Sequence, residues 1–385
     1  MKLKDINKKE FEDFCLESEY DNFFQSKYYA EIKRLDNYHT YFVGLEENGK
    51  IYAAALLLSK NISILQKRGF YAPRGFIIDY KNVDLVRSFS KELINYVKEK
   101  NGAYLKIDPL ITLYGRDNNG NIIEGGINNT KIVNQLKEIG WVQEDGELSY
   151  PLEDRILYKL DLNSNEDELF NNFSDDIKKI IETNNNIGIT TKKLEKANIQ
   201  KLIDIIDRST IVVDNLGISP SNYKEITNIL DNHNLLDITV AELNIDQYLE
   251  FLINKKNTTS NEEIDKKIEE VKQLQYQYGH SILIGLTLGV IYHNEYYVLI
   301  HAANLVDNNL YPLETIYWET IKKAKSMNFN TYNFYEVGDK IENNKMLKEI
   351  KGFNGNIVEL VGEFNYILNT YYYKRSMKKQ KKAYH

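Results

Sequence analysis

NIDQYLEFLINKKNTTSNEEIDKKIEEVKQLQYQYG, residues 244–279, is the stretch that decides the architecture of this 385-residue chain. The polar turn NTTSN divides it into two segments, and apolar residues of the second segment recur at helical spacing, where they can face apolar residues of the first. These residues are Ile264, Ile268, Val271 and Tyr278, opposite Tyr248, Leu249 and Leu252. Because lysines and acids alternate along both segments, we predict a self-packed helical hairpin rather than a phosphate-binding surface.

Alternating apolar runs that are typical of β-strands lie on both sides of this arm: LLDITVAEL precedes it and SILIGLTLGVIYHN follows it. The first half of the chain has the same order of helices, a meander of strands, a long helix and a further strand. There, Asn48-Gly49 between two apolar runs predicts a β-hairpin. The pattern predicts a mixed α/β (α+β) fold of two tandem domains resembling N-acetyltransferases (GNAT).

The expected domain limits follow from this order. We predict a first domain at 1–152, a second at 153–363 and the inserted arm at 245–279, with the C-terminal segment 364–385 packing back on the first domain. Within them we expect one continuous helix at 23–35, a strand, loop and strand at 64–79, and one final strand at 357–368.

Composition excludes several classes of protein. The lone Cys15 cannot form an internal disulfide, which suits a reducing cytoplasm, and six scattered histidines predict no metal site. No apolar run approaches the ~20 residues that span a bilayer. A net charge of −7 argues against a protein that coats nucleic acid, but residues 374–382 form a basic tail. A solvated helix end, contact with an anionic membrane and contact with RNA phosphate are its three interpretations.

A coenzyme A-dependent enzyme of this fold needs a glycine-rich loop, Q/R-x-x-G-x-G/A, that opens a helix and binds pyrophosphate. The nearest match, QKRGFY at 66–71, lacks the second glycine and leads into a strand. The chain also has no Walker loop and no GxSxG motif. We therefore expect no bound cofactor and a donor other than coenzyme A.

Four stretches, together with the arm, carry a family resemblance: FFQSKYYAEIKRL (23–35), YAPRGFIID with LKIDP (71–79, 105–109), YWETIKKAKSMNFNTYNFYEVGD (317–339) and IKGFNGNIVELVGEF (350–364). In this order they resemble the FemABX family of peptidoglycan-bridge aminoacyltransferases over nearly the whole chain. The resemblance implies transfer of an amino acid from aminoacyl-tRNA, as co-substrate, to the stem-peptide amine of lipid II or UDP-MurNAc-pentapeptide.

The resemblance also implies roles for individual residues. Lys33, in the QSxxYAxIK pattern, matches a lysine that binds the acceptor's pyrophosphate. Tyr335, in the motif TYNFYEVGD, is expected to bind substrate. Lys178 matches a basic helix only in part, since Glu182 replaces a usual basic residue. Near the C-terminal end, the family's motif is FKKGFGG. Here Ile350 occupies the position of the first lysine of that motif, so we assign the catalytic role to the next residue, Lys351.

Two further candidates come from the residues themselves. Arg74 lies in YAPRGF, where Pro73 fixes a turn and Gly75 permits close backbone approach, so it is either a substrate-binding or a structural residue. Asp108 ends a strand before Pro109. It is placed to hold the attacking amine, to accept its proton, or to cap the next turn.

Two other functions remain open at this point. One is an acyl-CoA N-acyltransferase with a degenerate loop, and the other is a catalytically silent protein that binds the precursor. For all three we expect a cytoplasmic protein, with the basic tail as the means of peripheral contact with the inner face of the plasma membrane. The sequence leaves the oligomeric state open.

Overall fold

The computed structural model describes residues 1–63, 66–144, 155–195, 198–217, 219–258, 262–304, 306, 310–338, 340–342 and 344–383, without the side chains of 380–383. The chain divides into two compact units. The first comprises Met1–Leu157, Gly338–Ile341 and Ile357–His385, and the second comprises Tyr158–Val337 and Glu342–Asn356. Each is described by itself.

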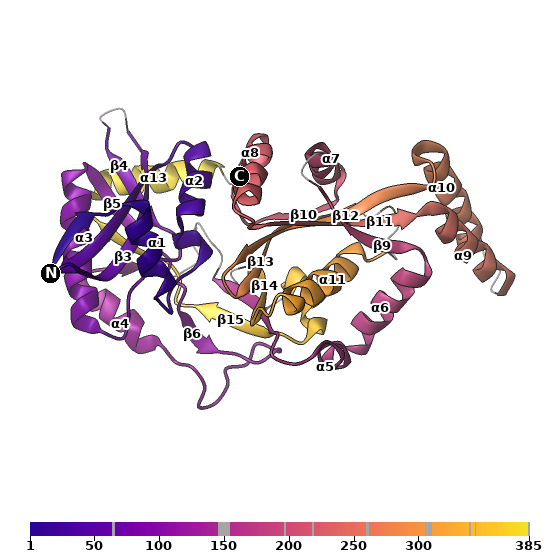
Figure 1. The fold of residues 1–385 in the computed structure, drawn as a ribbon, viewed down its shortest axis with the longest axis horizontal. Coiled ribbons are helices and arrows are strands. Elements are labelled where there is room, and N and C mark those ends of the chain that lie inside the picture. Colours follow the sequence, from indigo (N-terminus) through magenta and orange to yellow (C-terminus); the bar gives the residue numbers. More distant parts are fainter. Residues whose placement is uncertain are drawn as a thin grey trace. The chain divides into compact units, whose positions relative to one another are not determined.

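The first unit is built around a 7-stranded sheet in the order β1-β2-β3-β4-β5-β16-β7, coloured indigo to magenta with yellow C-terminal elements in Figure 1. Its elements are β1 (Lys2–Asp5), α1 (Lys8–Leu16), η1 (Phe23–Gln25), α2 (Lys27–Leu35), β2 (His39–Glu47), β3 (Lys50–Asn61), β4 (Arg68–Ala72), α3 (Val83–Glu99), β5 (Gly102–Ile107), β6 (Thr112–Gly115), α4 (Thr130–Ile139), β7 (Val142–Gln143), β15 (Asn356–Leu360), β16 (Phe364–Ile367) and α13 (Thr370–Ala383).

The second unit has a sheet in the order β8-β14-β13-β12-β11-β9, and β10 pairs with β13. Its elements are β8 (Ile156–Asp161), α5 (Glu166–Asn172), α6 (Asp175–Asn186), β9 (Ile189–Lys193), α7 (Ile199–Arg208), β10 (Ile211–Asp214), η3 (Pro220–Asn222), α8 (Tyr223–Asn232), β11 (Leu236–Asn244), α9 (Ile245–Thr258), α10 (Glu262–Tyr278), β12 (Ser281–Tyr292), β13 (Glu295–Ala303), α11 (Pro312–Ser326), β14 (Thr331–Gly338), α12 (Lys345–Ile350) and η4 (Lys351–Phe353).

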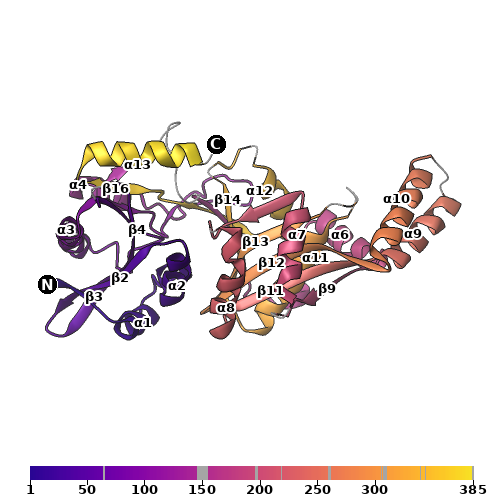
Figure 2. The same ribbon diagram turned by 90° about the horizontal axis from the view of Figure 1, so that it is seen from above.

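Both units repeat one connection. In the first, the parallel strands β4 and β5 are joined through α3; in the second, the parallel strands β13 and β14 are joined through α11. Antiparallel pairs such as β2–β3 and β11–β12 flank these crossovers. A crossover helix returns to the face of its own sheet, and α3 accordingly covers the apolar core of the first unit (Figure 2). The shared plan confirms the expected mixed α+β architecture.

The arm and the first hairpin confirm two local predictions. Helices α9 and α10 pack on one another and bury Tyr248, Leu252, Ile264, Ile268 and Val271. Strands β2 and β3 meet at Asn48-Gly49, where both residues have positive φ, as a tight hairpin turn requires.

Three local predictions were wrong. The expected helix at 23–35 breaks into η1 and α2 at Ser26, whose side chain caps α2 by accepting from the Tyr29 N–H. Of the stretch 64–79, residues 64 and 65 lie outside the described residues. Among residues 66–79, β4 is the one strand that forms, and the residues after it make a turn and a single bridge from Ile77 to Ala54. The expected strand at 357–368 divides into β15, which pairs with β6, and β16, which pairs with β5.

Candidate functional site

The candidate site of the first unit lies in a turn, Ala72–Gly75, that follows β4. Gln25 of η1 clamps this turn: its Nε2 donates to Pro73 O at 2.7 Å, and its Oε1 accepts from Leu56 N at 2.7 Å. A Cβ on Gly75 would lie 2.6 Å from Gln25 Cδ, so only glycine fits. The sequence did not single out Gln25, although it lies in the motif that contains Lys33.

The clamp places Arg74 against Asp108, which follows β5. The Arg74 N–H donates to Asp108 Oδ1 at 2.8 Å, and Arg74 Nη1 lies 3.4 Å from Asp108 Oδ2. The two side chains are only 2% and 5% exposed. Arg74 has a φ of 49°, a left-handed conformation that non-glycine residues rarely adopt outside functional or tightly fixed sites. The guanidinium and the carboxylate thus form a buried ion pair.

Lys33 is another buried cation of the first unit. It lies on α2 and is 7% exposed, and its Nζ is 5.2 Å from the centroid of the Tyr29 ring. A lysine this buried is uncommon. Its position on a fixed helix gives a preorganised point charge, which suits binding of an anionic group.

A small pocket of about 180 Å³ gathers three lysines that are far apart in the sequence: Lys60 on β3, Lys106 on β5 and Lys379 on α13. Lys106 is 1% exposed and pairs with Glu363 at 2.5 Å. Burial lowers the pKa of Lys60, whose Nζ lies 3.9 Å from the centroid of the Tyr38 ring. No local sequence signal relates these lysines, because only the tertiary fold brings them together.

In the second unit, Lys351 is exposed and lies on a fixed loop. Its carbonyl accepts from the Tyr158 hydroxyl at 3.1 Å, and the Ser174 N–H donates to Gly352 O at 2.8 Å. Lys351 is the first residue of η4, directly after the end of α12. Ile350 is 2% exposed and packs inward.

Lys178 and Tyr335 have surroundings that weaken their expected roles. Lys178 Nζ pairs with Asp175 at 3.0 Å and donates to Asn171 O at 3.3 Å, so its charge is already engaged by groups at the start of its helix and just before it. Tyr335 is 0% exposed and its ring packs near Tyr297, which argues against direct contact with a substrate.

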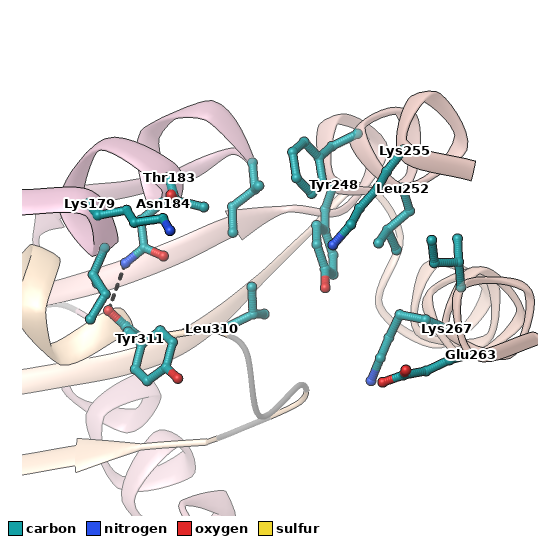
Figure 3. Close-up of a pocket in the computed structure, with 14 residues that line it drawn as sticks. Lys179, Thr183, Asn184, Tyr248, Leu252, Lys255, Glu263, Lys267, Leu310 and Tyr311 are labelled. Carbon is teal, nitrogen blue, oxygen red and sulfur yellow. Dashed lines mark hydrogen bonds between the residues drawn. The ribbon is translucent and has the colours of Figure 1, made fainter. Parts of the chain in front are cut away.

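A larger cavity of about 590 Å³ lies in the second unit between α6 and the arm (Figure 3). No motif in the sequence pointed to it. Among the described residues, no group of three or more His, Cys, Asp or Glu side chains is arranged to hold a metal ion. In the same part of the chain, no helix is long and apolar enough to cross a membrane.

These features define a protein of two tandem GNAT-like units, with a buried Arg–Asp pair in the first and an inserted arm in the second. Its fold is similar to that of a tandem GNAT protein from the clavulanic acid biosynthesis pathway, at a TM-score of 0.50, 7% identity and coverage of 86% and 84% of the two chains. It is more similar to the crystal structure of FemX, at a TM-score of 0.73, 19% identity and coverage of 97% and 99%.

The family model described as the FemAB family matches residues 6–265 and 254–380. The chain belongs to the FemAB family. It is 25% identical to Aminoacyltransferase FemA of Staphylococcus epidermidis over 99% of this chain and 100% of that protein. Membership and the names of these relatives identify an acyltransferase enzyme.

Proposed function

We propose that the protein transfers an amino acid from aminoacyl-tRNA to the stem-peptide amine of a peptidoglycan precursor, either lipid II or UDP-MurNAc-pentapeptide. The observation that carries the proposal is the buried Asp108 carboxylate. Arg74 fixes it at the end of β5, in a chain whose relatives are named aminoacyltransferases. A carboxylate held in place in this way can bind and orient an attacking ammonium or amine.

The reaction needs few dedicated groups because an aminoacyl ester is already activated. The amine nitrogen attacks the ester carbonyl carbon, the ester C–O bond breaks, and the tRNA hydroxyl leaves with the proton that the amine gives up. In this scheme Asp108 orients the amine. Lys351 of the second unit is a separate candidate, for stabilising an oxyanion, and is tested by itself.

Two features of the first unit support a phosphate-containing acceptor. Lys33 is a buried cation on a fixed helix, and the lysine pocket beside β4 and β5 adds Lys60 and Lys379, whereas Lys106 is paired with Glu363. Both acceptors carry a pyrophosphate, and clustered lysines bind such groups. We assign the pyrophosphate to this part of the first unit.

Helix α13 supports peripheral contact with an anionic membrane. Tyr373 and Ser376 face inward, the latter 3.1 Å from the Tyr104 hydroxyl. The opposite face carries an exposed stripe, which consists of Tyr371, Lys374, Arg375 and Lys378. The side chains of Lys381 and Lys382 lie outside the described residues. Each cation near an anionic bilayer contributes ~1 kcal/mol.

The transfer experiment gives the purified protein a full set of charged tRNAs with each acceptor in turn and measures radiolabelled amino acid in the product. Transfer to one acceptor supports the proposal. Precursor binding without transfer from any charged tRNA favours the silent binding protein, and transfer from an acyl-CoA alone favours the coenzyme A enzyme.

The membrane experiment measures co-sedimentation with phosphatidylglycerol vesicles. Lys374→Ala/Arg375→Ala/Lys378→Ala should weaken it about a hundredfold. Arg87→Ala/Lys91→Ala/Lys98→Ala, which removes the same charges from the exposed face of α3, should not. Equal losses in both variants would refute a specific role of α13.

A further inference from the structure

The cavity between α6 and the arm is enclosed by three helices and the segment before α11 (Figure 3). Its lining residues are Lys179, Ile180, Thr183, Asn184 and Ile187 of α6 and its C-terminal end, Tyr248, Phe251, Leu252 and Lys255 of α9, Glu263, Ile264 and Lys267 of α10, and Leu310 and Tyr311. All belong to the second unit. Its volume of about 590 Å³ falls within the range of small-ligand sites.

The charge of this cavity is positive. Three lysines and one glutamate line it, and the lysines come from three different helices. Lys267 is 2.9 Å from Glu270. In the described part of the chain, neither Lys179 nor Lys255 has a carboxylate within ion-pair distance. Figure 3 shows Lys255 directed from α9 into the space that α6 and α10 border. Lys179 and Lys255 are thus the two lysines of the cavity that can bind an anion.

The walls of the cavity are apolar and aromatic. Tyr311 is 42% exposed, and the rings of Tyr248 and Phe251 lie nearly parallel, 18° apart in plane at 6.5 Å. Asn184 holds the Tyr311 segment in place, since its Nδ2 donates to Tyr311 O and to Thr315 Oγ1, both at 2.8 Å. Tyr248 is 4% exposed and Phe251 is half-buried, so Tyr311 is the exposed ring of this wall. An exposed aromatic ring beside lysines is the combination on which nucleobases stack while phosphates are neutralised.

We propose that this cavity binds a nucleoside phosphate, with the phosphate on Lys179 and Lys255 and the base against the aromatic wall. The two sources of such a ligand are a free nucleotide and an unpaired nucleotide of an RNA. Only the second source rests on the proposed function, in which the amino acid donor is an RNA. A fatty acid would satisfy the apolar wall and one lysine but would leave the second lysine without an anion.

The geometry of α6 explains why Lys179, and not Lys178, serves this site. Successive residues on a helix point about 100° apart. Lys178 therefore turns towards Asp175 and Asn171, whereas Lys179 turns to the arm. Glu182, whose negative charge would repel a phosphate on this helix, is not among the residues that line the cavity.

The experiment measures binding of a fluorescent, 5′-phosphorylated ribotrinucleotide to the full-length protein by anisotropy. Lys179→Ala/Lys255→Ala should weaken binding about tenfold or more, and should reduce the slope of log affinity against log salt by about 1.4. Lys256→Ala/Lys266→Ala is the matched control, because these arm lysines pair with Asp265 and Glu270 and do not line the cavity. Equal weakening in both double variants would overturn the proposal.

Competition identifies the source of the ligand. Displacement by a mononucleotide as well as by the trinucleotide supports a free-nucleotide site. Displacement by uncharged tRNA and the trinucleotide, without the mononucleotide, supports an RNA site. Displacement by dodecanoate alone would overturn the assignment in favour of a fatty acid. Tyr311→Leu should weaken the trinucleotide while sparing inorganic phosphate, since it removes the stacking surface and leaves the lysines.

The proposal that the cavity binds a nucleoside phosphate can fail independently of the proposal that the protein transfers an amino acid. The anisotropy experiment contains no acceptor and no esterified amino acid, so its result stands even if the protein transfers nothing. If transfer occurs and the cavity holds RNA, Lys179→Ala/Lys255→Ala should raise the KM for aminoacyl-tRNA and leave both kcat and the KM for the acceptor unchanged. Unchanged KM for the donor, with nucleotide binding lost, would support the free-nucleotide source.

Discussion

The buried pair of Arg74 and Asp108 makes the sharpest prediction, because stability and activity should respond differently to its removal. Asp108→Asn keeps an oxygen for the Arg74 N–H but removes the negative charge that faces a guanidinium only 2% exposed. Breaking one partner of such a pair costs about 3–5 kcal/mol. For a unit of this size, that corresponds to a loss of roughly 6–20 °C in Tm.

The double variant Arg74→Met/Asp108→Asn separates the two roles. It removes both charges and leaves no buried ion alone, so most of the lost stability should return. Transfer should not return, because the carboxylate that orients the amine is absent. We expect kcat/KM of Asp108→Asn and of the double variant to fall about 100-fold or more.

Thermal and urea unfolding, followed by circular dichroism, measure the stability of the four proteins of this cycle. Transfer at saturating donor, over a range of acceptor concentrations, measures kcat/KM. A double variant that regains both stability and activity would show that the pair is only structural. A loss below about 1 kcal/mol in Asp108→Asn would show that the carboxylate does not hold Arg74 in solution.

Three other predictions concern the rest of the molecule. Gly75→Ala should destabilise the first unit by about 2–3 kcal/mol in urea unfolding, since the new Cβ would meet the buried side chain of Gln25 at 2.6 Å; a neutral effect would mean that the clamp is loose. Lys351→Ala should lower kcat about 100-fold while Lys348→Ala, one turn earlier, leaves it unchanged; equal effects would remove Lys351 from catalysis. Burial lowers the pKa of His301 from 6.5 to about 4, so the unfolded state alone takes up a proton between these values. Stability is therefore full above pH 6.5 and falls by about 3 kcal/mol towards pH 4, a loss that His301→Gln should remove from the pH dependence of the unfolding free energy.

Sequence patterns correctly predicted the elements that are determined by residues close together in the chain. The arm was predictable because its apolar residues follow helical spacing within one segment, and the β2–β3 hairpin because Asn48-Gly49 supplies the positive φ that a tight turn needs. The break at Ser26 was missed because a capping side chain overrides a continuous apolar pattern, and the short β1, β6 and β10 because their pairing partners are remote.

What the sequence by itself determined is the repeated plan, the arm and the family. The motif residues Lys33, Arg74, Asp108 and Lys351 could be named, but not the contacts they make. Only the tertiary structure decided that Gln25 clamps the Arg74 turn and that Lys60, Lys106 and Lys379 share one pocket. It also decided that Lys179 rather than Lys178 faces the cavity beside the arm. The physical reason is that a helix or a turn is set by residues a few positions apart. A site is set by side chains that meet only when strands and helices from distant segments pack together.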